Sequence, residues 1–273
     1  MDAATNLRVV ARQMKAAQDE VRHIEPFSSQ HTEFDLMGAY AAARLIHEAR
    51  LEEGATPVGR KIGFTNSDMW LRYGVHNPIW AYMYDTTVVS VTDKNQFCSI
   101  AKFVEPKIEP EIVFHFHSAP SVNADLSEIL NCIDWVAHAF EIVQSHFSDW
   151  KFRAVDAIVD CALHGTMLIG EQQAVTNLGE DLISSLERFS ITLLCDGQIR
   201  EIGTGANVLG NPLTAIKYLI EVLSKQTQSV PLQANEMVTT GTITAARSIC
   251  ACESWQTEIK GINLPGLSVQ FVE

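Results

Sequence analysis

The sequence is short of basic residues: 20 lysines and arginines stand against 33 aspartates and glutamates, which gives a net charge of −13. Nucleic acids and anionic membranes both bind basic surfaces, so this balance argues against either partner. A small anionic substrate stays compatible, because the local charge of a site can oppose the global sign. No apolar run reaches the length of a membrane span, and the first twenty residues lack the apolar core of a signal peptide.

Cysteines are also few, with six dispersed over 273 residues, and their spacing is not that of a disulfide framework. A chain of this length can bury a sizeable core without covalent staples, so we expect reduced thiols and a cytoplasmic protein. Cys250 and Cys252 form a C-x-C pair, but no second pair or histidine cluster accompanies them. We therefore expect both to be small buried residues of a C-terminal strand.

The first third of the chain has a helical pattern. Apolar residues recur at helical spacing from Leu7 to about Val21, and Thr32 and Asp35 open a second helix that ends at Gly54. These helices predict an N-terminal cap over residues 1–57.

From residue 58 onward the sequence pattern changes to short runs of β-branched residues separated by turn residues. Two helices are expected among them, at 125–137 and 211–226. Runs of strands with few helices between them predict an α+β fold, in which the helical N-terminal section packs on a β-rich catalytic domain with a mixed sheet over residues 58–273.

Two glutamates interrupt a strand-like segment, KIEPEIVFHF at 107–116. Glu109 and Glu111 are separated only by Pro110, and residues two apart on a strand point to the same face, about 7 Å apart. On a solvated edge strand such a pair needs no explanation, and Pro110 is typical of an edge. If the face lines a cavity, the two charges repel and require a cation such as Mg²⁺ or Mn²⁺. The spacing alone favours the edge-strand interpretation.

A third glutamate shifts this balance toward a metal. Glu141 lies in the apolar run HAFEIVQSHF at 138–147, where a buried carboxylate is rarely without a partner. Three carboxylates, with waters or substrate completing six positions, fit Mg²⁺. His115 and His117 lie beside the glutamates, but an isolated H-x-H is typical of a strand surface, so no competing histidine site is expected.

Six segments then carry a resemblance to a known family: VGRKIGFTN (58–66), EPKIEPEIVFHF (105–116), CIDWVAHAFEIVQSHFSDWKF (132–152), VDAIVD (155–160), GTGANVLGNPLTAIKYL (203–219) and EMVTTGTIT (236–244). Nearly end to end, the chain resembles the 2-keto-4-pentenoate hydratase and 4-oxalocrotonate decarboxylase group of the fumarylacetoacetate hydrolase superfamily. The resemblance implies a homo-oligomer in which Mg²⁺ or Mn²⁺ is held by Glu109, Glu111 and Glu141.

The resemblance also implies a metal-dependent lyase of aromatic-compound catabolism, acting on a small unsaturated 2-oxo or 2-hydroxy acid. Hydration of a 2-keto-4-pentenoate-type acid is the main expectation, and decarboxylation of 2-oxo-3-hexenedioate is the alternative. A non-catalytic member that binds a small acid or assembles with a partner is a third possibility, motivated by the altered segment 161–164. Retention of the three glutamates and Lys61 speaks against it.

Further site residues follow from the resemblance. Lys61, in GRKIG, is implied as a proton-transfer group with a lowered pKa or as a holder of a substrate carboxylate. Asp160 is implied to position water or to support the metal site, and Asp156 is its alternative, which could simply cap a turn.

Two departures from the family pattern concern the pocket. The family usually continues the aspartate with Asn-Ala-Ser, whereas this chain reads Cys161-Ala162-Leu163-His164, so His164 is a candidate general acid or a filler. Ile79 stands where hydratases often carry an aspartate, which is more like the decarboxylase branch. The residues expected to contact substrate are Ile79, Leu163, Thr240 and Gly241.

Overall fold

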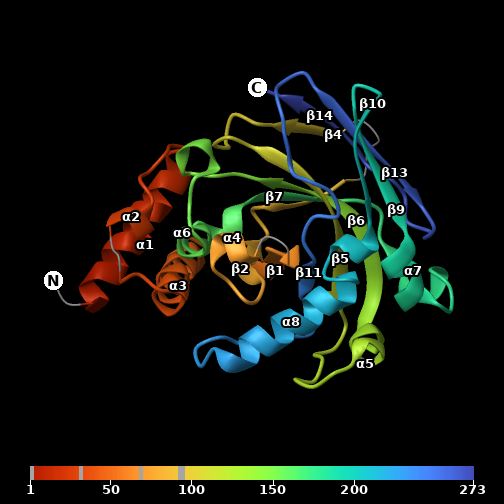
Figure 1. Cartoon of the computed structure of the whole chain (residues 1–273), viewed down its shortest axis with the longest axis horizontal. Coiled ribbons are helices and arrows are strands. Elements are labelled where there is room, and N and C mark those ends of the chain that lie inside the picture. The colour runs from red at the N-terminus through yellow and green to blue at the C-terminus, as the bar shows by residue number, and fades with distance from the viewer. Residues whose placement is uncertain (1–2, 31–32, 68–69, 92–95) are drawn as a thin grey trace.

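The structure is a computed structural model that describes residues 3–30, 33–67, 70–91 and 96–273. Its helices and sheets form the α+β architecture that the sequence predicts, with the helical N-terminal section against a β-rich body (Figure 1). Among the described residues, no helix is both long and apolar enough to cross a membrane.

The N-terminal section consists of α1 (Ala3–Asp19), α2 (Phe27–Gln30) and α3 (Leu36–Glu52). The Asp35 side chain caps α3 by accepting a hydrogen bond from the Gly38 amide, as its position in the sequence predicts. Thr32, the other residue expected to open this helix, lies outside the described residues. The buried face of α1 and α3 shares one hydrophobic cluster with β2 and α6, so these helices pack directly on the body.

A nine-stranded mixed sheet forms the centre of the body, with the order β2-β1-β11-β5-β6-β7-β3. Two short strands pair off this path, β12 with β5 and β8 with β6. The strands are β1 (Pro57–Gly63), β2 (Ile79–Tyr84), β3 (Val88–Ser90), β5 (Lys107–Phe116), β6 (Ile133–Val143), β7 (His164–Ile169), β8 (Gln173–Ala174), β11 (Met237–Thr239) and β12 (Arg247–Ser248).

A second, five-stranded sheet has the order β10-β9-β13-β14-β4 and lies at the upper right in Figure 1. Residues of both sheets, among them Ile108, Ile142, Trp255 and Phe271, form one buried cluster, so the sheets pack on each other. Its strands are β4 (Gln96–Ser99), β9 (Ser190–Cys195), β10 (Gln198–Thr204), β13 (Ser254–Lys260) and β14 (Ser268–Val272).

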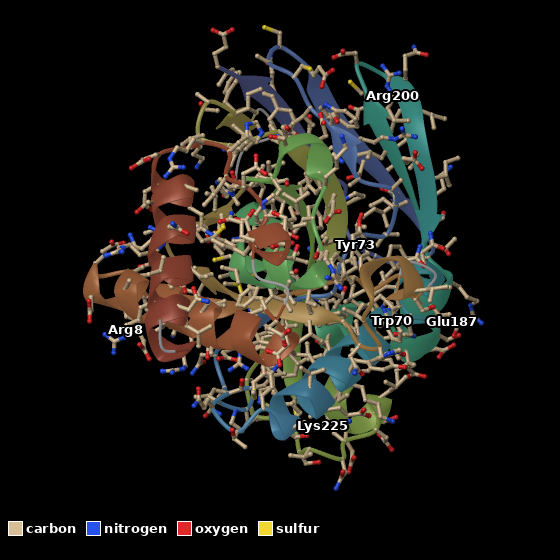
Figure 2. The ribbon with its side chains drawn as sticks, turned by 60° about the vertical axis from the view of Figure 1, so that its left-hand side comes forward. Arg8, Trp70, Tyr73, Glu187, Arg200 and Lys225 are labelled. Carbon is tan, nitrogen blue, oxygen red and sulfur yellow. The ribbon has the colours of Figure 1, made fainter. Side chains whose placement is uncertain are left out.

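The remaining helices are α4 (Trp70–Tyr73), α5 (Leu126–Asn131), α6 (Ala154–Val159), α7 (Leu182–Arg188) and α8 (Pro212–Lys225). Asn211 caps α8 and Pro212 occupies its first turn, which explains why the expected helix at 211–226 begins where it does. Apolar residues of α5, α7 and α8 pack with Phe114 and Phe116 of β5. Charged side chains such as Arg8, Glu187 and Arg200 lie at the periphery (Figure 2).

Two local expectations are wrong. The helix expected at 125–137 ends at Asn131, because Ile133 begins β6, which pairs with β5 along its whole length. Cys250 and Cys252 are exposed rather than buried, since they lie in the turn before β13 and not on a strand. All six cysteines are within the described residues and carry free thiols, as expected.

Pro110 does not mark an edge strand, because β5 lies between β6 and β11 in the middle of the sheet. On the β11 side, however, β11 pairs with Val113–His115 and β12 with Lys107–Ile108, which leaves a gap in the ladder around Pro110. The loop after β11 crosses this gap, where the Ile243 amide donates to the Pro110 carbonyl at 2.9 Å. Proline is tolerated here because no partner requires its missing amide hydrogen.

Asp156 provides a test of how the N-terminal helices are attached. Its buried carboxylate accepts hydrogen bonds from the amide and hydroxyl of Ser28 and from the Arg153 amide, so it caps α6 and holds α2. We expect Asp156→Ala to lower the free energy of unfolding by about 2–4 kcal/mol, because buried donors lose their acceptor. Denaturant titration measures this, with Glu187→Ala on the exposed surface as the control. A loss below about 0.5 kcal/mol would contradict the assigned role.

Candidate metal centre

The pairing of β5 with β6 brings the three glutamates together. Glu109 and Glu141 are direct cross-strand partners, and Glu111 follows two residues along on the same face. One carboxylate oxygen from each lies within 4.8 Å of the others. Glu111 and Glu141 are fully buried and Glu109 is partly buried, so the edge-strand interpretation is wrong and the pair faces the interior.

The two buried glutamates each have one oxygen bound by the protein and one left over. The Gly241 amide donates to Glu111 Oε2 at 3.0 Å, and His164 Nδ1 lies 2.7 Å from Glu141 Oε1. Glu111 Oε1 and Glu141 Oε2 are buried with no hydrogen-bond partner. Buried anionic oxygens are costly unless a cation or donor meets them, and carboxylate oxygens are the ligands that Mg²⁺ prefers. The donor set therefore fits a divalent cation.

Lys61 on β1 is the basic residue beside the cluster. Its ammonium lies 3.1 Å from Glu141 Oε2 and donates to the Ala162 carbonyl at 2.9 Å, and the residue is only 3% exposed. Three carboxylates with one ammonium leave a net charge of −2 when all are ionised, which a divalent cation would neutralise.

The electrostatics of the cluster follow from this crowding. Burial raises the pKa of Glu109 to about 7, and burial together with the Glu141 charge raises the pKa of Glu111 well above its usual range. For Glu141, burial acts in the same direction, but Lys61 and His164 outweigh it and hold its pKa at about 2. Burial alone would lower the pKa of Lys61, yet without a metal the three carboxylates raise it.

Gly241 can present its amide to Glu111 only because it is a glycine. Its φ is +86°, and a Cβ there would lie 2.1 Å from Thr65 Oγ1. The neighbouring Thr240 bonds through both its amide and its hydroxyl to the Ile112 carbonyl. This loop is therefore fixed to β5, and the Thr240 hydroxyl is used within the protein.

A left-handed turn precedes His164. Cys161, Ala162 and Leu163 have φ values of 48°, 50° and 66°, although none is glycine or asparagine. Such residues cost about 1–2 kcal/mol each in this region and persist only where the surroundings impose them. The turn aims the Ala162 carbonyl at Lys61 and places His164 against Glu141.

The other predicted site residues lie at different distances from the cluster. A Cβ at Gly63 would be 3.2 Å from Ile79 Cγ1 and 3.8 Å from Lys61 Nζ, so the Ile79 side chain and the Lys61 ammonium flank the same glycine. Leu163 is buried in the same hydrophobic cluster as Ile79. The carboxylate of Asp160 instead bonds to His146, at 2.8 Å from Nδ1, and to Gln18, so it belongs to the contact with α1.

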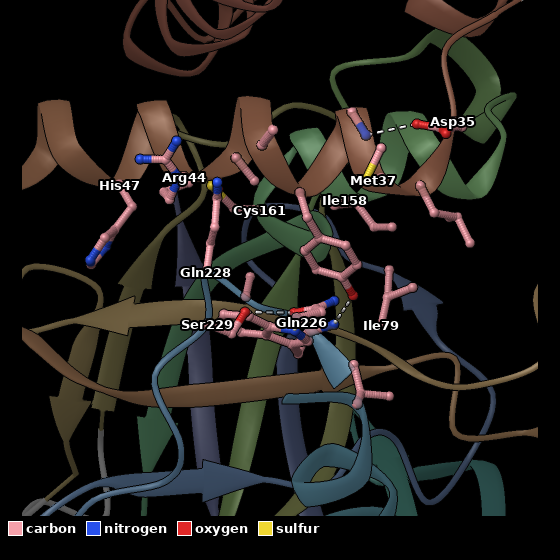
Figure 3. Close-up of a pocket in the computed structure, with 18 of the residues that line it drawn as sticks. Asp35, Met37, Arg44, His47, Ile79, Ile158, Cys161, Gln226, Gln228 and Ser229 are labelled. Atoms are coloured by element: carbon pink, nitrogen blue, oxygen red, sulfur yellow. Dashed lines mark hydrogen bonds between the residues drawn. The ribbon is translucent and has the colours of Figure 1, made fainter. Parts of the chain in front are cut away.

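A large cavity is separate from the glutamates. It measures about 1180 Å³ and lies between α3, β2 and the chain after α8, lined by residues that include His47, Ile79, Cys161 and Gln226 (Figure 3). Neither Lys61 nor the three glutamates of the cluster line it. Ile79, which flanks Gly63 together with Lys61, and Cys161, in the turn before His164, connect the two regions.

Sequence reasoning did not find three partners of the cluster. Thr87 lies 2.9 Å from His164 Nε2, the Ala162 carbonyl accepts from Lys61, and Thr65 packs against Gly241. A threonine in a turn and a backbone carbonyl carry no motif, so nothing in the pattern could have identified them.

Comparisons with known proteins agree with this geometry. A 4-oxalocrotonate decarboxylase from a Pseudomonas species is 30% identical over 229 residues, which is 82% of each chain. A 2-keto-4-pentenoate hydratase from Paraburkholderia phymatum is 26% identical over 263 residues, covering 96% of this chain and 97% of the relative. The search against family models found no match.

Among solved structures, 4-oxalocrotonate decarboxylase from Pseudomonas putida G7, complexed with magnesium and adipate, has a TM-score of 0.89 at 23% identity, covering 100% of this chain and 99% of that one. A fumarylpyruvate hydrolase from Pseudomonas aeruginosa, complexed with Mn²⁺ and pyruvate, has a TM-score of 0.56 at 14% identity over 78% of this chain and 88% of that one. The chain thus has the fold of the fumarylacetoacetate hydrolase superfamily, and it belongs to the family of 4-oxalocrotonate decarboxylases and 2-keto-4-pentenoate hydratases.

The cluster predicts opposite effects of one substitution on stability and on metal binding. Glu111→Gln removes one of three mutually repelling carboxylates, so the metal-free protein should melt at a higher temperature. The same change removes a ligand, so the rise in melting temperature that Mg²⁺ gives the unaltered protein should be lost. Thermal melts with EDTA and with MgCl₂ measure both effects.

Glu187→Gln, at an exposed glutamate of α7, is the matched control and should change neither. A Glu111→Gln variant that keeps its full response to Mg²⁺ would remove Glu111 from the metal site.

Proposed function

We propose that this chain is a Mg²⁺-dependent lyase that acts on a small unsaturated 2-oxo or 2-hydroxy acid. Hydration of a 2-keto-4-pentenoate-type acid is the main reaction, as in the relatives of that name. The observation that carries the proposal is the group of three glutamates with two buried oxygens that accept no hydrogen bond, of which only Glu141 Oε2 lies beside the Lys61 ammonium. We further propose a cytoplasmic homo-oligomer in aromatic-compound catabolism, with residues 1–57 as a cap on the catalytic domain.

The reaction requires that the negative charge developing on the substrate be stabilised. A cation held by Glu109, Glu111 and Glu141 would supply Lewis-acid stabilisation of negative charge at the 2-oxygen. From 2-hydroxypenta-2,4-dienoate, loss of the enol proton and protonation at C5 give the 2-oxo-3-enoate. Water then adds across C3=C4, with the hydroxyl on C4 and the hydrogen on C3.

Lys61 is the residue that we assign to the proton at C3. Its charged ammonium lies among the carboxylates, where it can donate a proton or hold the substrate carboxylate. Ile79 and Leu163 would cover the apolar part of the substrate and exclude water from it, together with the Thr240–Gly241 loop. Asp160 would act indirectly, because its backbone carbonyl accepts from the Leu163 amide at 2.7 Å and so supports the left-handed turn.

Lys61→Met separates a catalytic role from a structural one. We expect kcat to fall at least about 100-fold, as for loss of a general acid. The affinity for Mg²⁺ should stay equal or rise, because a positive charge leaves the carboxylates. Stopped-flow absorbance with 2-hydroxypenta-2,4-dienoate and calorimetric titration with MgCl₂ measure the two quantities. Lys225→Met, at an exposed lysine, is the control.

If Lys61→Met has a kcat close to that of the unaltered enzyme, Lys61 does not take part in the chemical step. If the unaltered protein binds Mg²⁺ but neither hydrates the dienoate nor releases CO₂ from 2-oxo-3-hexenedioate, the substrate class proposed here is wrong.

The alternative is decarboxylation of a dioate such as 2-oxo-3-hexenedioate, and Lys107 favours a substrate with a second carboxylate. Lys107 precedes Glu109 by two residues, so it lies on the same strand face, and its charge opposes the raised pKa of Glu109. Its ammonium lies 3.8 Å from the centre of the Trp150 ring. The magnesium-bound decarboxylase of Pseudomonas putida G7 also contains a dicarboxylate, adipate.

Lys107→Met tests this second carboxylate. We expect KM for 2-oxo-3-hexenedioate to rise about tenfold, the effect of losing about 1.4 kcal/mol of binding, and KM for 2-hydroxypenta-2,4-dienoate to stay unchanged. Lys102→Met is a matched control, because Lys102 also lies over an aromatic ring, that of Phe103, but outside the strand. An equal rise in KM for both acids would show that Lys107 does not recognise the second carboxylate.

A further inference from the structure

Both ring nitrogens of His164 are occupied by the protein. Nδ1 lies 2.7 Å from Glu141 Oε1 and Nε2 lies 2.9 Å from the Thr87 hydroxyl, and the side chain is only 3% exposed. A group that acts as a general acid needs a nitrogen within reach of the substrate. With neither nitrogen free, His164 is poorly placed for the catalytic role expected from the sequence.

Within the series Glu141–His164–Thr87, the donor and the acceptor of each hydrogen bond can be assigned. A carboxylate only accepts, so the nitrogen that faces Glu141 carries the hydrogen. In the neutral ring Nε2 then accepts. The single hydrogen of the Thr87 hydroxyl has two acceptors within reach, Nε2 at 2.9 Å and the Tyr84 carbonyl at 3.2 Å, and we assign it to the nearer one, Nε2. The same hydroxyl oxygen accepts from the Tyr84 amide at 3.2 Å, so each member has a partner.

Thr87 is itself held firmly by the sheet. Its amide donates to the Tyr84 carbonyl, and its own carbonyl accepts from the Met167 amide and from the Thr166 hydroxyl, both at 2.8 Å. The turn between β2 and β3 is thereby fixed to β7, the strand that His164 begins. This frame and the left-handed turn at 161–163 leave His164 little freedom to move.

The consequence falls on Glu141. With Oε1 bound to His164, the other oxygen, Oε2, is the one that lacks a hydrogen-bond partner and lies beside Lys61. His164 therefore determines which oxygen of Glu141 faces the cluster. Partners that orient a ligand in this way typically affect metal affinity by 10–100-fold.

We propose that His164 and Thr87 form a positioning pair that fixes Glu141 as a one-oxygen ligand of the divalent cation. His164 is thus a positioning residue and not a proton donor to the substrate. This inference rests on the metal site proposed above. It concerns His164, which ends the segment 161–164 that departs from the family pattern in the sequence analysis.

Two amide substitutions separate the two nitrogens. The amide nitrogen of asparagine is as many bonds from Cα as Nδ1, whereas that of glutamine can reach the position of Nε2. We expect His164→Asn to keep the Kd for Mg²⁺ within about threefold, because it can still donate to Glu141. His164→Gln and His164→Ala should weaken binding by about 10–100-fold, and Thr87→Val should weaken it by a smaller factor.

Calorimetric titration of the full chain with MgCl₂ gives these constants without any substrate. Melting in EDTA establishes that each variant is folded. If His164→Ala is not folded, the comparison of His164→Asn with His164→Gln tests the proposal. The positioning pair would be overturned if His164→Asn and His164→Gln lost Mg²⁺ affinity equally. It would also be overturned if His164→Gln and His164→Ala both kept the unaltered affinity. So would unchanged Mg²⁺ affinity together with a 100-fold lower kcat, which would return His164 to the chemistry.

The same titration distinguishes this inference from the proposed function. If the unaltered protein does not bind Mg²⁺, the metal site itself fails. If it binds Mg²⁺ and His164→Ala binds equally well, only the positioning pair fails.

Discussion

The mutual repulsion of three glutamates in a dry interior is the constraint on which the site depends. Folding places one oxygen from each within 4.8 Å of the others, and the buried ammonium of Lys61 lies 3.1 Å from one oxygen of Glu141. Such an arrangement costs free energy in the protein alone, so the sheets around it must enforce it. The neighbouring contacts serve this end, because the Gly241 amide and His164 each hold one oxygen and leave the other for a cation.

Several loops and turns around the site hold the three glutamates in place. The gap in the ladder beside Pro110 admits the loop that carries Gly241, and the turn between β2 and β3 brings Thr87 to His164. Strained backbone at Cys161–Leu163 connects these parts by aiming one carbonyl at Lys61. Strain of this kind is typical of functional sites and is maintained by the packing around it.

Much of the fold and of the glutamate cluster could be predicted from the sequence. Strand alternation predicts that Glu109 and Glu111 share a face, and the apolar setting of Glu141 predicts that it is buried with a partner. The strand register that makes Glu141 the partner of Glu109 was not readable, because it depends on the pairing of β5 with β6. The same long-range pairing turned Ile133–Ala137 into strand against its helical appearance. The left-handed turn had no signal either, since it contains no glycine.

The direct opposition of Glu109 and Glu141 has a consequence for how this protein can change over evolution. Side chains alternate between the two faces of a strand, so a one-residue slip of β6 against β5 would carry Glu141 into the apolar layer that contains Ile108, Phe140 and Ile142. Insertions and deletions within either strand are therefore forbidden as long as the ion site is under selection. Length variation among relatives should accumulate in the hairpin connection near α5 and spare the paired segments.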